Sequence, residues 1–103
     1  MMFSDIYVTA ATLKEANGIA RAVVEEKLGA CVNIWPIRSV YRWEGSIEED
    51  EEYALSIKTK SSLVDTVTTR VRQLHSYENP CVISFSVESG SPAYLDWIHE
   101  ETL

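Results

Sequence analysis

Three side chains in this sequence are of types that can bind a divalent metal ion. His75 and Glu78 stand three residues apart, where a helical pattern gives way to turn residues, and Cys31 opens a β-branched and aromatic stretch. An imidazole with a nearby carboxylate supplies two metal ligands, or one ligand and the group that orients it. Because copper favours sulfur and imidazole donors, these residues predict a site for copper or another divalent metal made of Cys31, His75 and Glu78.

Each of these residues also has a purely structural interpretation. A histidine at the end of a helix can hydrogen-bond the last carbonyls, and Glu78 can accept from nearby backbone or hydroxyl donors. Free cysteine is often buried, so Cys31 is also a candidate core residue, and Cys81 is a stronger one. The acidic run 48–52 is typical of a solvated arm, because successive side chains of an extended segment alternate faces and cannot all converge on one ion.

Strand and helix patterns alternate along the chain and must position these residues. Thr12 and Glu15 form a capping box that starts a helix, which Gly29 is expected to stop in a left-handed conformation. Ser62 is expected to cap the second helix, and Pro36 should lie at a sheet edge or a bulge. The expected strands are 3–11, 31–43, 53–58 and 81–88, and the expected helices are 13–28, 63–74 and 92–98.

The order of these elements predicts an α+β fold. Strand, helix, strand, strand, helix, strand is the ferredoxin-like βαββαβ arrangement, an antiparallel sheet with both helices on one face, here followed by a short C-terminal helix. At 103 residues, the chain 1–103 is expected to be a single domain. The aromatic residues on the strands exceed what two helices can cover, so we expect copies of the chain to associate. These residues are Trp35, Tyr41, Trp43 and Tyr53.

Composition disfavours several classes of function. Sixteen acidic and nine basic residues give a net charge of −7, which repels nucleic acid and anionic lipid. We expect no membrane insertion, because no apolar run reaches the roughly 20 residues that span a bilayer. Without a signal-peptide pattern or a disulfide framework, the chain is expected to be cytoplasmic with free thiols. The sequence has no glycine-rich phosphate loop and no nucleophile with an evident base, so we expect neither an enzyme nor an organic cofactor.

Six sequence blocks, in order and spacing, carry a resemblance to a known family. They lie at 30–34, 41–45, 47–52, 58–60, 74–80 and 92–97, and read ACVNI, YRWEG, IEEDEE, KTK, LHSYENP and PAYLDW. The chain resembles the CutA family of divalent-cation tolerance proteins over nearly its whole length. The resemblance implies a tight homotrimer, similar to the PII signalling proteins, in which long hairpins reach across neighbours. It also implies a response to metal ions, with copper as the proposed ligand.

The same resemblance implies a second set of functional residues and a second function. Polar and aromatic side chains of the matched blocks can line a small-ligand pocket in the trimer cleft, or they can hold the subunits together. The protein would then be a PII-like signalling or interaction module that binds a small molecule or a partner protein. Ser76 departs from the family, which usually has proline at this position. The cleft residues are Arg42, Lys58, Tyr77, Tyr94 and Trp97.

Overall fold

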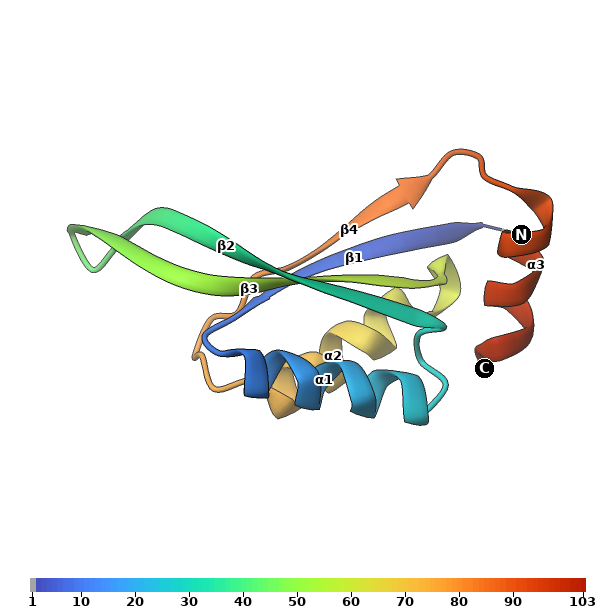
Figure 1. Ribbon diagram of the computed structural model, residues 1–103, viewed down its shortest axis with the longest axis horizontal. Helices are drawn as coiled ribbons and strands as arrows, with labels where there is room; N and C mark the ends of the chain where they lie inside the picture. Colours follow the sequence, from blue (N-terminus) through green and yellow to red (C-terminus); the bar gives the residue numbers. More distant parts are fainter. Residues whose placement is uncertain (1) are drawn as a thin grey trace.

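Four strands form one antiparallel sheet in the computed structural model, which describes residues 2–103 (Figure 1). The order in the sheet is β2-β3-β1-β4, and helices α1 and α2 pack on one face, as the ferredoxin-like prediction requires. The strands are β1 (Phe3–Ala10), β2 (Cys31–Trp43), β3 (Ser46–Lys60) and β4 (Val82–Val87). The helices are α1 (Leu13–Glu25), α2 (Val64–Leu74), α3 (Pro92–Glu101) and a 3-10 turn (Ser61–Leu63) before α2.

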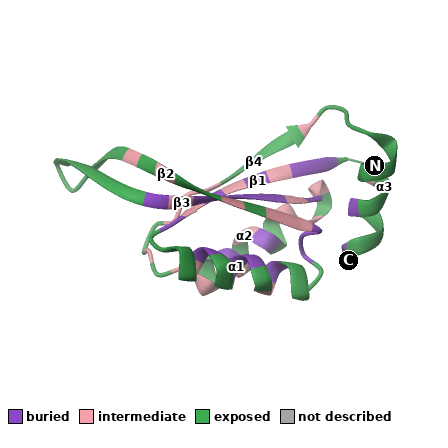
Figure 2. Cartoon of the chain, in the orientation of Figure 1, coloured by how far each residue is buried: buried purple, intermediate pink, exposed green. Residues whose placement is uncertain are grey.

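The hydrophobic core lies between the sheet and α1 and α2. Alternation along β1 sends Ile6 and Val8 toward the helices, and their partners across β3, Ile57 and Leu55, point the same way because paired residues share a face. All four side chains are almost completely buried. Figure 2 shows the buried residues concentrated on these strands and on the inner sides of the helices. The helices contribute Ala16, Ile19, Val23, Val67 and Val71 to this cluster.

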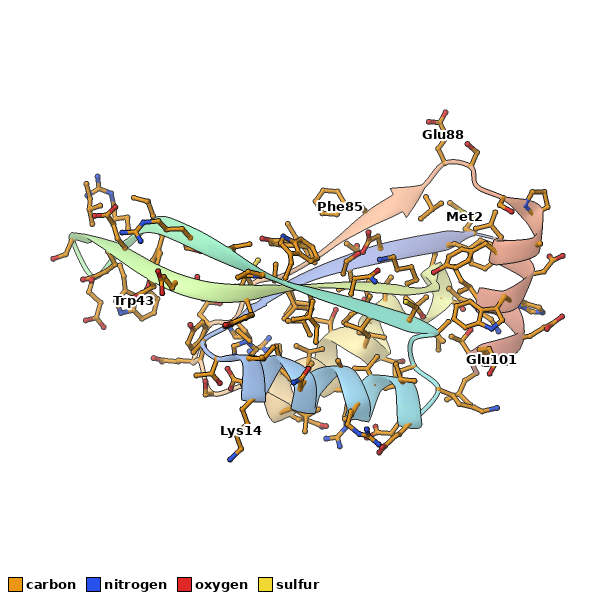
Figure 3. The ribbon with its side chains drawn as sticks, viewed as in Figure 1. Met2, Lys14, Trp43, Phe85, Glu88 and Glu101 are labelled. Atoms are coloured by element: carbon orange, nitrogen blue, oxygen red, sulfur yellow. The ribbon has the colours of Figure 1, made fainter. Side chains whose placement is uncertain are left out.

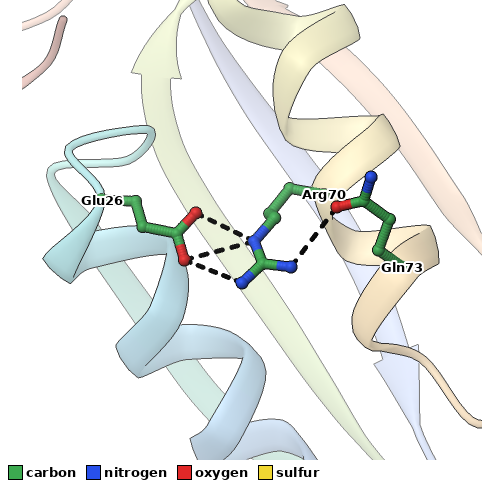
Figure 4. A network of polar contacts seen from close by, with 3 residues as sticks. All are labelled: Glu26, Arg70 and Gln73. Carbon is green, nitrogen blue, oxygen red and sulfur yellow. Dashed lines mark hydrogen bonds and ion pairs between the residues drawn. The ribbon is translucent and has the colours of Figure 1, made fainter.

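The first helix begins as predicted but ends differently. The Thr12 hydroxyl oxygen accepts from the Glu15 amide at 3.1 Å, which confirms the Thr12 half of the capping box, whereas the Glu15 carboxylate accepts from the Ala11 amide and not from that of Thr12. The helix stops at Glu25, and Lys27, not Gly29, adopts the left-handed conformation (φ 59°). Gly29 is needed for space instead, since a Cβ there would lie 2.8 Å from a methyl carbon of Ile57. After the helix, Glu26 forms an ion pair with α2 (Figure 4) through Arg70 at 2.9 Å.

Two further local predictions can be compared with the structure. Ser62 does not cap α2, because the 3-10 turn precedes the helix and its first residues carry no side-chain cap. Pro36 lies on β2, which is an edge strand, as expected for a residue without an amide hydrogen. It pairs with Tyr53 in an uninterrupted register, so the alternative of a bulge is wrong.

The β2–β3 hairpin extends well beyond the sheet and gives the molecule its 44 Å length (Figure 1). Trp43 pairs with Ser46, and the two residues between them, Glu44 and Gly45, both have positive φ, which is typical of a tight type I′ turn. The acidic run therefore lies within β3 and not in the turn. Residues 48–51 are exposed as expected, but Glu52 is only 6% exposed, so the prediction of a solvated arm is wrong at its last residue.

The sheet face opposite α1 and α2, called the open face below, carries exposed apolar side chains. Trp35, Ile83 and Phe85 remain 41%, 50% and 55% exposed there. Figure 3 shows Phe85 on the side of β4 that faces away from the helices. Helix α3 contributes Ile98 to a small cluster with Phe3 at one end of the sheet. Within residues 2–103, no helix is long and apolar enough to cross a membrane.

Candidate functional site

The loop between α2 and β4, residues 75–81, is fixed to the sheet by its histidine. Nε2 of His75 lies 2.7 Å from the carbonyl oxygen of Thr9, and Nδ1 lies 3.1 Å from the amide nitrogen of Tyr77. A carbonyl only accepts and an amide N–H only donates, so this geometry requires a neutral ring with its proton on Nε2. His75 contacts β1 and its own loop, rather than the last carbonyls of α2, because the backbone becomes extended at this residue (φ −84°, ψ 142°).

Glu15, in the first turn of α1, holds the same loop. Its Oε2 accepts from the Ser76 amide at 2.9 Å, and its Oε1 accepts from the Ala11 amide at 3.3 Å. Partial burial raises the pKa of Glu15, but the hydrogen bonds from the Ser76 and Ala11 amides outweigh it, so the pKa lies below its ordinary value. The contact requires an amide hydrogen at position 76, which serine has and proline lacks.

An open pocket of about 900 Å³ lies beside this loop, the hairpin and the open face. Glu52 borders it, and its Oε2 accepts a 2.8 Å hydrogen bond from the Tyr77 hydroxyl. Thr9 and Cys81 also border the pocket. The wall of the pocket also includes four aromatic residues and two arginines: Tyr7, Tyr41, Trp43 and Tyr77, with Arg38 and Arg42.

Burial and the Glu52 carboxylate together raise the pKa values of three groups that border this pocket. Burial first, and then the hydrogen bond to Glu52, raise the pKa of Tyr77 well above its ordinary value. Burial and the Glu52 charge also raise the pKa of Cys81, although a hydrogen bond with the Thr9 side chain acts in the opposite direction. Burial, followed by the charges of Cys81 and Glu52, raises the pKa of Tyr7. The Cys81 thiol is therefore protonated at neutral pH, which makes it a poor nucleophile.

The predicted metal ligands occupy separate places in the subunit. Cys31 opens β2 opposite Lys58, which itself pairs with Asp5 on β1. His75 contacts β1 four residues further on, at Thr9, about 13 Å away at the strand's rise per residue. Glu78 is exposed at the border of the pocket. No group of three or more histidine, cysteine or acidic residues in the described part of the chain could hold a metal ion.

The five predicted cleft residues divide into two groups. Arg42 and Tyr77 both border the pocket. Lys58 lies nearer the other end of the open face, where its ammonium group donates to the Ser56 hydroxyl at 2.7 Å. Tyr94 and Trp97 stack at a tilt on α3, with ring centroids 5.5 Å apart, and the Tyr94 hydroxyl lies beside Cys31.

Sequence reasoning missed the buried carboxylate that borders the pocket, Glu52. Glu52 was assigned to the solvated acidic run, although strand alternation places it two residues before Ala54 and four before Ser56, both of which are buried on the open face. Extending the alternation of β3 backwards would have separated Glu52 from its exposed neighbours. Nothing in the sequence places Tyr77 against it, because the two residues are 25 positions apart.

The fold and the pocket define a class of protein. A βαββαβ subunit with an open sheet face, a projecting hairpin and a pocket at the hairpin base is a ferredoxin-like α+β protein. The family model of the CutA1 divalent ion tolerance protein matches residues 4–101. The chain therefore belongs to the CutA1 family.

Curated relatives and solved structures agree with this assignment. "Protein CutA" of Mus musculus is 52% identical over 96% of this chain, which spans 56% of that protein. "Divalent-cation tolerance protein CutA" of Archaeoglobus fulgidus is 46% identical, covering 96% of this chain and 97% of its own. The chain thus spans just over half the length of its mouse relative but nearly all of the archaeal one.

Two solved structures superimpose closely on the subunit. CutA1 from Oryza sativa has a TM-score of 0.97 at 39% identity, and the match covers 100% of this chain and 95% of that one. The protein from Archaeoglobus fulgidus, described as periplasmic, has a TM-score of 0.96 at 45% identity, with 97% of this chain and 98% of that chain covered. Residues 4–101 and the whole topology are therefore those of the CutA1 family.

Proposed function

We propose that this protein is a homotrimeric divalent-cation response protein that binds copper or a similar divalent ion and has no enzymatic activity of its own. The observation that carries the metal function is membership of a family described by divalent ion tolerance. Cytoplasmic location is part of the proposal and rests on the two free cysteines, Cys31 and Cys81. Relatives are described as periplasmic in Archaeoglobus fulgidus and chloroplastic in Arabidopsis thaliana.

The open face supports the trimer. Trp35, Ile83 and Phe85 leave apolar surface exposed on a sheet that is covered by helices on its other side. Contiguous exposed apolar surface is typical of protein interfaces, and the two edge strands, β2 and β4, add backbone groups that can pair with a neighbouring sheet. A closed assembly covers both features at once.

The trimer is also what the proposed metal site needs. Cys31 and His75 lie apart within one subunit, so a shared ion requires ligands from two subunits. The His75 ring offers a free lone pair only after Nδ1 releases the Tyr77 amide. The Cys31 thiol sits on an edge strand, where a neighbouring chain can approach. Soft sulfur and imidazole donors favour copper over magnesium or calcium.

Native mass spectrometry tests both parts of this proposal. Metal-stripped protein is reloaded with copper or zinc, desalted and compared with a Cys31→Ala, His75→Ala variant. We expect a trimer that retains about one ion per subunit in the wild type only. Cys81→Ala is the matched control, because it removes the other thiol, and it should retain the metal. Equal retention by the double variant would exclude Cys31 and His75 as ligands, and a monomer would exclude the assembly.

A second candidate function is supported by the pocket itself. A space of about 900 Å³ bordered by aromatic rings, two arginines and a buried glutamate has the size and the lining of a small-molecule site. The protein would then act as a PII-like module whose ligand or partner binds at the cleft. A thermal-shift screen of small metabolites tests this, and a stabilising ligand whose effect is lost in Arg42→Gln would support it.

A further inference from the structure

Glu52 is a buried carboxylate without a cation. Its residue is 6% exposed, and none of the ion pairs in the described residues includes it. Arg38 lies 3.9 Å from Glu51 instead, at the exposed surface of the hairpin. Removing a carboxylate from water is costly unless a cation or several donors replace the water, and here only the Tyr77 hydroxyl donates.

The second oxygen of Glu52 is open to solvent. Oε1 has no hydrogen-bond partner within residues 2–103, yet no fully buried side-chain nitrogen or oxygen in that range lacks one. Oε1 therefore retains contact with solvent. Glu52 lines this pocket and also a smaller one beside Ala11 and Pro36, but Tyr77, which donates to its carboxylate, lines only the first of the two. The Glu52 carboxylate, which the Tyr77 hydroxyl holds in place, therefore has an oxygen free to accept hydrogen bonds from a molecule in the pocket.

The residues around Glu52 favour a planar cation over a compact one. Tyr7, Tyr41 and Trp43 border the same space, and aromatic faces attract cations, with the planar guanidinium group also able to stack on them. The two N–H groups along one edge of a guanidinium match a carboxylate better than the compact ammonium does. Arg38 and Arg42 border the pocket as well and would repel a ligand that is only cationic, unless it also carries an anionic group.

A metal ion fits this place less well. Glu52, Glu78 and Cys81 are the residues on the wall of the pocket that could ligate a metal ion, but Glu78 is exposed, and burial and the Glu52 charge keep the Cys81 thiol protonated. The described residues contain no group of three potential ligands here or elsewhere. A buried carboxylate beside aromatic rings is the pattern expected for an organic cation.

We propose that the pocket at the hairpin base binds a small free guanidinium compound of the arginine type, with its guanidinium on Glu52 and its carboxylate toward Arg38 and Arg42. This rests on the second candidate function, the small-molecule pocket, and names its ligand class. Tyr77 positions Glu52 through its hydroxyl, and the loop that carries Tyr77 is held by His75 and Glu15.

Calorimetric titration of the intact protein with L-arginine tests the proposal. We expect a dissociation constant on the order of 1 mM, typical of a ligand of this size with one buried ion pair. L-citrulline has nearly the same shape with a neutral side chain and should bind at least about tenfold more weakly, and Glu52→Gln should lose arginine binding by a similar factor. Glu49→Gln removes an exposed carboxylate from the same strand, outside the pocket, and should bind like the wild type.

A second comparison keeps the test informative if Glu52→Gln folds poorly. Agmatine is arginine without its carboxylate, so Arg42→Gln should weaken arginine binding several-fold and leave agmatine binding unchanged or improved. Equal binding of arginine and citrulline, or unchanged binding by well-folded Glu52→Gln, overturns the proposal. So does a wild type that binds neither guanidinium compound, which would mean that a neighbouring subunit already satisfies Glu52. If another metabolite then binds in an Arg42-dependent way, the pocket function stands and only the ligand class falls.

Discussion

Replacing Glu15 with glutamine should loosen the loop that positions Tyr77. The Glu15 carboxylate joins the first turn of α1 to the Ser76 amide at 2.9 Å and to the Ala11 amide at 3.3 Å. Glutamine keeps the length and one acceptor oxygen but turns a donor toward one of the two amides. One of the two contacts is therefore lost in Glu15→Gln, and the other is no longer assisted by a charge.

The size of the effect follows from these contacts. A hydrogen bond to a charged group contributes about 1.5–3 kcal/mol when buried, and the 3.3 Å contact and the partial exposure of Glu15 reduce that figure. The negative charge near the helix N-terminus adds about 0.3–1 kcal/mol. We expect Glu15→Gln to lower the free energy of unfolding by about 1–2 kcal/mol at neutral pH.

The lowered pKa of Glu15 also predicts how the stability difference between wild type and Glu15→Gln changes with pH. The pKa of Glu15 is lowered in the folded protein, so its folded value lies below its unfolded value. A carboxyl of this kind contributes stability that is fully present above its unfolded pKa, about 4.3, and is lost as the pH falls through its folded pKa. The difference between wild type and Glu15→Gln should therefore be constant near pH 7 and shrink progressively below about pH 4.5.

Urea unfolding at one fixed subunit concentration measures the difference. Glu25→Gln is the matched control, because Glu25 lies on the same helix in an exposed pair with Arg21 and should change stability by less than about 0.5 kcal/mol. Equal losses in the two variants would refute the role of the loop contacts. A Glu15→Gln effect that is the same at pH 3 and pH 7 would refute the charge-dependent part of the reasoning.

Three further predictions test the packing, the pocket and the assembly. Gly29→Ala should destabilise the protein by about 1–3 kcal/mol, because the added Cβ meets two core methyl groups. Gly18→Ala, in open space on α1, should instead stabilise it by up to about 1 kcal/mol. Urea midpoints that shift in the same direction in both variants would contradict this. Tyr77→Phe should cost about 1–3 kcal/mol by depriving Glu52 of its donor, and less in a Glu52→Gln background; additive losses in a double-mutant cycle would refute the contact. In the proposed trimer, the urea midpoint should rise with protein concentration, and a constant midpoint in reversible unfolding would argue against it.

The fold could be predicted because its signals are local and repeated. Alternation in β1 and helical spacing in α1 each depend on a few neighbouring residues, and the order of elements then leaves one common topology. The predicted helix ends were less accurate, since the residue that adopts the left-handed conformation depends on which of its neighbours packs against the core. Gly29 is the residue type that usually ends a helix in a left-handed conformation, but here it packs against Ile57 and Lys27 adopts that conformation instead.

The site was harder because its contacts join distant segments. Residue type alone made Cys31 and His75 candidates, but no local pattern states that one lies near Tyr94 and the other on the Thr9 carbonyl. Charge also misled. Glu52 ends a run of exposed acidic residues, and only its position in the sheet register separates it from them.

Exposure along β3 changes where the hairpin leaves the sheet, and this change explains why the pocket lies there. Residues 46–51 are exposed and most residues from Glu52 to Lys60 are buried or half-buried. A carboxylate at this boundary is close enough to solvent to meet a ligand and deep enough in the protein to attract a cation more strongly than a surface carboxylate does. A ligand on Glu52 would touch the hairpin and the loop 75–81 together, so its binding energy would restrain the hairpin relative to the sheet. If the hairpin reaches neighbouring subunits, ligand binding and trimer stability are then coupled, and each must change the other by the same factor.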